Sequence, residues 1–162
     1  MSLQTFAAAF IHRMRRAAYW LWKFWRTLHP VIDENRRVET RAHLPELWRP
    51  AFDRLLPPDQ AHVIRLWKAI KEASELSEPD RAELLLLAVV HDLGKGITRP
   101  TIFERVAKAL LPLPNSSHPI AGARLLKKWG APRDLIRRVR FHHEPPGNDR
   151  LLALFQSFDD SV

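Results

Sequence analysis

The chain has 162 residues, of which 46% are hydrophobic and 27% charged, proportions typical of a globular domain that buries its own core. It contains no cysteine, so disulfides, thiolate metal sites and cysteine nucleophiles are excluded, and imidazole and carboxylate groups must hold any metal. The formal charge of +8 is uneven, because residues 1–29 carry five basic side chains and no acid. The rest has 21 basic and 18 acidic side chains, which is no strong signal for nucleic-acid binding.

Residues 3–28 place apolar side chains at three- and four-residue steps, which predicts an amphipathic helix. Its apolar run 6–11 is too short to span a bilayer, and the basic residues follow this run instead of preceding it as in a secretory signal. We therefore expect a cytoplasmic protein whose N-terminal helix packs on the domain or forms a homo-oligomer. Because Trp20, Trp22 and Trp25 lie among basic residues, peripheral attachment to a membrane surface is the alternative.

Pro30 ends this helix, and the charged residues 30–43 lack periodicity, so we expect a linker there. The expected division is an N-terminal helix at 1–29, a linker at 30–43 and a helical domain at 44–162. No segment alternates with period two over the length of a strand, so the domain is predicted to be all-α, with six or seven helices. The expected helices cover about residues 44–55, 59–73, 77–93, 100–111, 117–129, 132–143 and 150–159.

His91 and Asp92 form the first candidate site, at the end of an apolar helix and just before Gly94-Lys95-Gly96. A carboxylate in this place is costly to bury unless it is paired or binds a cation. Imidazole with carboxylate suits first-row divalent metals. A lone His-Asp pair is more often a polar cap, so the neighbouring residues decide between the two interpretations.

These neighbours resemble the HD superfamily of metal-dependent phosphohydrolases, whose pattern is an early His, a His-Asp doublet, later histidines and a final Asp. The string VVHDLGKG is similar to the HDxGK form of the doublet, and the resemblance covers about residues 50–160. It implies an HD-domain-like helical bundle that cleaves a phosphate ester of the nucleotide or cyclic-dinucleotide class with metal-activated water. The matching residues are His62, His91, Asp92, His118, His142, His143 and Asp159.

The same resemblance implies two divalent ions, drawn from iron, manganese, zinc, nickel and cobalt. The first would be held by His62, His91, Asp92 and Asp159. Asp92 would bridge to a second ion, for which His118, His142 and His143 supply nitrogens. Lys95 lies in a glycine-flanked turn and is expected to bind a substrate phosphate. Asp160 is the alternative to Asp159, because the final helix ends close to both.

The string His142-His143-Glu144 is similar to HD-GYP cyclic-dinucleotide phosphodiesterases, but Pro145-Pro146-Gly147 stands where Gly-Tyr-Pro would follow. The chain is thus closer to short, HDIG-like single-domain proteins. Two other functions stay open. One is a catalytically silent signalling or scaffold module, against which the complete ligand set argues. The other is a nucleic-acid-binding helical module using a basic face made of Arg133, Arg137, Arg138 and Arg140.

Overall fold

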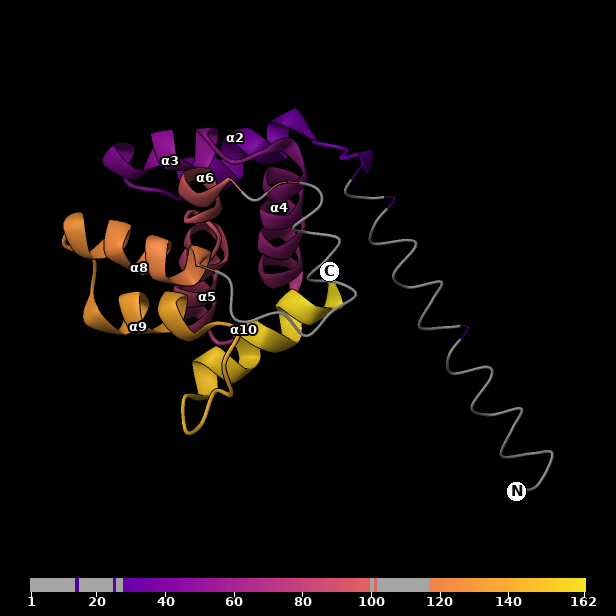
Figure 1. Cartoon of the computed structure of the whole chain (residues 1–162). Coiled ribbons are helices and arrows are strands. Elements are labelled where there is room, and N and C mark those ends of the chain that lie inside the picture. The colour runs from indigo at the N-terminus through magenta and orange to yellow at the C-terminus, as the bar shows by residue number, and fades with distance from the viewer. Residues whose placement is uncertain (1–13, 15–24, 26–27, 100, 102–116) are drawn as a thin grey trace, which may run out of the picture.

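The computed structural model describes residues 14, 25, 28–99, 101 and 117–162, and every regular element in these ranges is helical, as the sequence predicts (Figure 1). The expected amphipathic helix at 3–28 lies largely outside the described residues, as does the expected helix at 100–111. None of the described helices is both long and apolar enough to cross a membrane. The elements are α2 (Glu34–Ala42), the 3₁₀ helix η1 (Glu46–Trp48), α3 (Arg49–Asp53), α4 (Pro57–Glu72), α5 (Glu78–Val90), α6 (Lys95–Thr98), α8 (His118–Lys128), α9 (Arg133–Phe141) and α10 (Arg150–Ser161).

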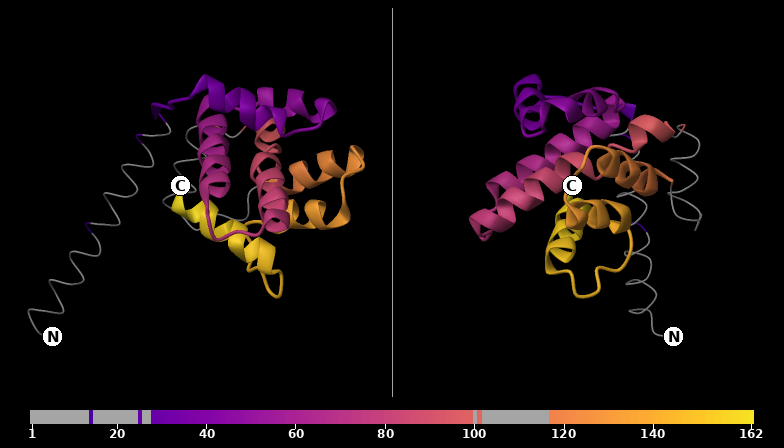
Figure 2. Two further views of the ribbon diagram at one scale, coloured as in Figure 1. Left: turned by 180° about the vertical axis from the view of Figure 1, so that it is seen from behind. Right: turned by 90° about the vertical axis from the view of Figure 1, so that its left-hand side faces the viewer.

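Helix α5 is the centre of the fold. Its residues 87–90 are all almost completely buried, because this helix is apolar on nearly every side. Helix α4 runs beside it, α9 and α10 also pack against it, and α2 and α3 cross one end of the α4–α5 pair (Figures 1 and 2). Ser77 caps α5 by accepting a hydrogen bond from the Asp80 amide, which confirms the predicted start of this helix.

Helix α2 corrects the expectation of a linker at 30–43. Asp33 caps this helix by accepting a hydrogen bond from the Arg36 amide, and Arg41 makes a bidentate ion pair with Asp53. Thr40 is completely buried, and α2 packs against both α4 and α3. Capping and tertiary ion pairs therefore stabilise a helix that has too few apolar residues to show helical periodicity.

Two prolines also behave differently from the prediction. Pro57 and Pro58 were expected to break the chain before a helix at 59, but they form the first turn of α4. Proline is tolerated there because the first amides of a helix have no intrahelical acceptor. At the other end of the domain, Gly130 has φ +73°, which confirms the predicted left-handed turn after α8.

Helices α8 and α9 form an antiparallel hairpin packed beside α5 (Figure 1). Because their connection is short, the first residue of α8 and the last residues of α9 lie at the same end of the hairpin. Asp149 caps α10 through the Leu152 amide, and α10 continues to Ser161, two residues beyond the predicted end. The ends of α5, α8 and α9 and one side of α4 and α10 therefore surround one point of the domain, where the candidate site lies.

Candidate metal centre

The fold brings all seven predicted ligands together from five helices. Ligand atoms of His62, His91 and Asp92 lie within 4.8 Å of one another, and so do those of His118, His142 and His143. We call these the first and the second triad. Asp159 joins the first triad, because its Oδ1 lies 2.9 Å from Nε2 of His62 and 3.9 Å from Nε2 of His91. Asp160, the alternative from the sequence, is exposed and belongs to neither triad.

The two triads meet at the carboxylate of Asp92, which is 1% exposed. Its Oδ2 lies 3.3 Å from Nε2 of His91 in the first triad. Its Oδ1 lies 3.1 Å from Nε2 of His118 in the second. Each oxygen of this side chain therefore faces a different cluster of nitrogens, which is the placement that a bridging carboxylate requires.

The hydrogen bonds of His91 and His142 determine which ring nitrogen faces the centre. Nδ1 of His91 lies 2.9 Å from the Ala88 carbonyl oxygen, and Nδ1 of His142 lies 2.7 Å from that of Val139. A carbonyl only accepts, so both Nδ1 atoms carry the proton, and a neutral ring then has its lone pair on Nε2. Such outer hydrogen bonds orient most metal-binding histidines in this way.

Burial favours neutral imidazoles in the second triad, and local charges favour an ionised carboxylate at Asp92 in the first. Burial lowers the pKa of His142 to about 2 and that of His143 to about 4. Burial opposes ionisation of Asp92, but His91 and Lys95 outweigh it and hold the pKa of Asp92 well below its usual range. Neutral imidazole and carboxylate are the forms that bind metal ions.

The residues present fit a divalent metal. Oδ1 of Asp92 is fully buried and accepts no hydrogen bond of acceptable geometry, although Nε2 of His118 is close to it. Nε2 of His118 also lies 3.3 Å from Nε2 of His142. A buried carboxylate oxygen without a hydrogen bond is costly unless it binds a cation, and nitrogen with oxygen donors suits first-row divalent ions.

Gly94 allows the two triads to approach each other. A Cβ atom at this position would lie 2.0 Å from the His118 carbonyl oxygen and 2.6 Å from the Gly122 amide nitrogen. The turn that carries Asp92 therefore packs directly on the first turn of α8. The sequence indicated Gly94 and Gly96 only as the end of α5, because a contact with a segment 24 residues away has no local signal.

Lys95 has a different environment from the one predicted. Its Nζ lies 2.5 Å from Oδ2 of Asp92 and 3.7 Å from Oδ1 of Asp59, so it is not a freely extended side chain. Asp59 is 3% exposed and was missed by the sequence reasoning. An acidic residue in the first turn of a helix is usually explained by its favourable interaction with the helix dipole. Nothing in the sequence distinguishes a buried acidic residue at this position from an exposed one.

Gln156 is a second residue that the sequence reasoning missed. Its Nε2 donates to the carbonyl oxygens of His142 and Glu144, at 3.0 and 2.6 Å. These bonds tie α10 to the turn that follows α9 and so hold the backbone of the His142-His143 pair. No signal in the sequence marks this glutamine, because its partners are backbone groups of the turn that follows α9.

One comparison with known proteins gives a match. The family model of the HD domain matches residues 60–158, which is more than half of the chain. The matched region contains both triads and ends directly before Asp159. No curated protein and no solved structure is significantly similar to the chain.

Proposed function

The chain belongs to the HD domain family, and from this premise we propose that it is a metal-dependent phosphohydrolase acting on a small phosphate ester. The family suggests metal-dependent hydrolysis in general. The nucleotide or cyclic-dinucleotide class of substrate is part of our proposal. The observation that carries it is the convergence of both triads on the two oxygens of Asp92.

We assign His62, His91, Asp92 and Asp159 to one ion. The second ion is assigned to His118, His142 and His143, with Asp92 as the bridge. A pair of divalent ions would polarise the phosphoryl group and activate water for in-line attack. The protein contributes the rigid arrangement, because the Nδ1 bonds of His91 and His142 fix the orientation of both rings.

Lys95 is the residue we assign to substrate charge. Its ammonium group, 2.5 Å from Oδ2 of Asp92, adds positive charge at the side of the centre where that oxygen lies. Without this ammonium group, an approaching phosphoryl group would meet only the carboxylates of Asp92 and Asp59, which are negatively charged like the phosphoryl group itself. Oδ1 of Asp59, 3.7 Å from Nζ of Lys95, is a second negative group that keeps the ammonium group at this side of the centre.

The test is metal analysis of the purified full chain together with a screen of phosphomonoesters, nucleotides and cyclic dinucleotides. Asp92→Ala should remove bound metal and all hydrolytic activity, while helical circular dichroism persists. His43→Ala is the matched control, because His43 is exposed and lies outside both triads. Full metal content in Asp92→Ala would contradict the centre. Metal binding by the wild type without hydrolysis of any substrate class would favour a catalytically silent module.

A further inference from the structure

The positive charge of the helical domain is concentrated in the α8–α9 hairpin. Residues 118–143 contain seven Lys and Arg side chains and a single acid, Asp134. The rest of residues 30–162 contains more acids than bases. The nearly balanced composition of the domain therefore combines a strongly basic hairpin with a mildly acidic remainder.

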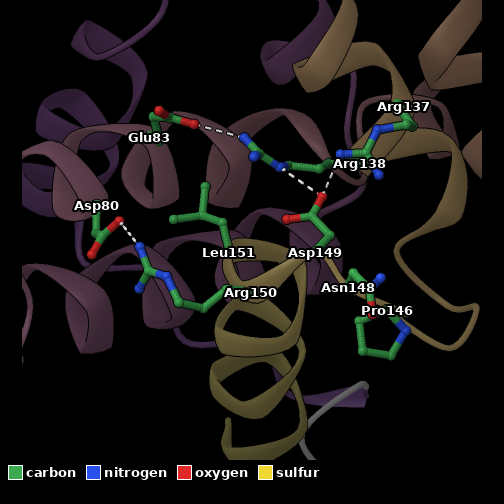
Figure 3. Close-up of a pocket in the computed structure, with 9 residues that line it drawn as sticks. All are labelled: Asp80, Glu83, Arg137, Arg138, Pro146, Asn148, Asp149, Arg150 and Leu151. Carbon is green, nitrogen blue, oxygen red and sulfur yellow. Dashed lines mark hydrogen bonds and ion pairs between the residues drawn. The ribbon is translucent and has the colours of Figure 1, made fainter.

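Two of the hairpin arginines are neutralised by acids of α5 and of the α10 cap. Arg138 donates to Glu83 at 2.6 Å and to Asp149 at 3.0 Å, and Arg137 donates to Asp149 at 2.6 Å (Figure 3). The pocket in this figure also contains the Arg150–Asp80 pair, so its three arginines face three acids. Its balanced charge gives an anion no advantage, and it is not the surface we consider further.

The other five basic residues are exposed and make no ion pair within the part of the chain that the structure describes. On α8 they stand at positions i, i+3 and i+4, and on α9 they are seven residues apart. Both spacings place side chains on one face of a helix. On α8 this face lies opposite the buried Gly122, Ala123 and Leu126. We use the name basic face for these five residues together, three on the exposed side of α8 and two on that of α9: Arg124, Lys127, Lys128, Arg133 and Arg140.

An exposed aromatic ring adjoins the basic face. Phe141 is 41% exposed, and the Arg140 guanidinium lies 5.4 Å from its ring centroid. The only other large apolar side chain exposed on the hairpin is Ile120. A membrane-binding surface needs several bulky apolar side chains to insert, whereas unpaired cations beside an aromatic ring are typical of proteins that bind single-stranded nucleic acid.

We propose that the basic face and Phe141 bind a single-stranded nucleic acid, with the cations on the phosphates and the ring stacked on a base. Helix α8 has 11 residues and is about 16 Å long, which is enough to contact several successive phosphates. Phe141 directly precedes His142 in the chain, so a strand stacked on this ring would lie one residue along the chain from a proposed ligand of the second triad. Binding at this face does not depend on the proposed hydrolysis.

The experiment measures binding of the full chain to a fluorescent oligothymidylate of about 20 nucleotides by anisotropy, between about 50 and 200 mM salt. The triple variant Arg124→Gln, Lys127→Gln, Arg133→Gln should reduce the slope of log affinity against log salt by about 2, because each phosphate contact contributes about 0.7 on a single strand. Phe141→Ala should weaken binding about tenfold without changing the slope. Either result alone is sufficient if the other variant fails to fold, as judged by its melting temperature.

The matched control replaces three basic residues of the N-terminal segment, Arg13→Gln, Arg15→Gln and Arg16→Gln, and so removes the same charge. This control should weaken oligonucleotide binding less than the hairpin triple variant does. Equal or greater weakening would overturn the proposal, and so would absence of binding by the wild type at about 50 mM salt. A hairpin variant that loses binding to phosphatidylserine vesicles but keeps oligonucleotide binding would identify a lipid surface and overturn it as well.

Discussion

Replacing Gly94 with Ala tests whether the close approach of two backbone segments builds the centre. The new Cβ would lie 2.0 Å from the His118 carbonyl oxygen and 2.6 Å from the Gly122 amide nitrogen. Both are backbone atoms, so no side-chain rotation relieves the overlap. The turn and the start of α8 must therefore separate by about 1 Å or more, in a core packed too densely to absorb such a change.

Overpacking of a core costs about 1–3 kcal/mol, and a double backbone overlap belongs at the upper end of that range. For a chain of this length, about 3 kcal/mol lowers the melting temperature by roughly 6–12 °C. In the wild type, Nε2 of His118 lies 3.1 Å from Oδ1 of Asp92. The same movement increases this distance, so the content of bound metal should also decrease.

Thermal unfolding followed by circular dichroism, with metal analysis of the same samples, measures both effects. Gly96→Ala is the control, because it makes the same substitution two residues away and its Cβ would meet no atom closer than 3.5 Å. It should change the stability by no more than about 1 kcal/mol. A Gly94→Ala protein with the melting temperature and metal content of Gly96→Ala would refute the reasoning.

Two further predictions concern the second triad and the cap of α10. His118→Ala and His142→Ala should each lower the metal content from two ions toward one and sharply reduce turnover, as elemental analysis and kinetics can measure. A single ion in the wild type, unchanged in His118→Ala, would contradict the two-ion assignment. Asp149→Asn keeps a capping side chain but loses the ion pairs to Arg137 and Arg138, so it should cost about 1 kcal/mol at pH 7. Although burial opposes ionisation, the Leu152 amide and Arg138 lower the pKa of Asp149, so this contribution is present above about pH 4 and is lost as the pH falls further. Urea unfolding at neutral and acidic pH should therefore show a difference between the two proteins that shrinks in acid, and a constant difference would disprove the ionic origin.

Local sequence signals predicted the elements whose stability is local. The Ser77 cap, the apolar run of α5 and the glycine after α8 each act within a few residues, and all three were predicted correctly. Helix α2 was missed because its stability depends on Asp53 and on α4, which no window of a few residues contains. The first turn of α4 was missed because Pro57 and Pro58 were interpreted as a break in the chain, although proline is also tolerated in the first turn of a helix.

The sequence by itself determined which residue types are available for chemistry and in what order they occur. It contains an ordered set of histidines and aspartates, and with no cysteine present only imidazole and carboxylate groups remain to hold a metal. Only the tertiary structure decided that Asp159 lies beside His62, because these residues are 97 positions apart and meet through the packing of α10 on α4. It also decided that the two oxygens of Asp92 face different triads and that Lys95 is paired. Such relations depend on the directions of side chains from separate helices, and these directions exist only after the helices have packed.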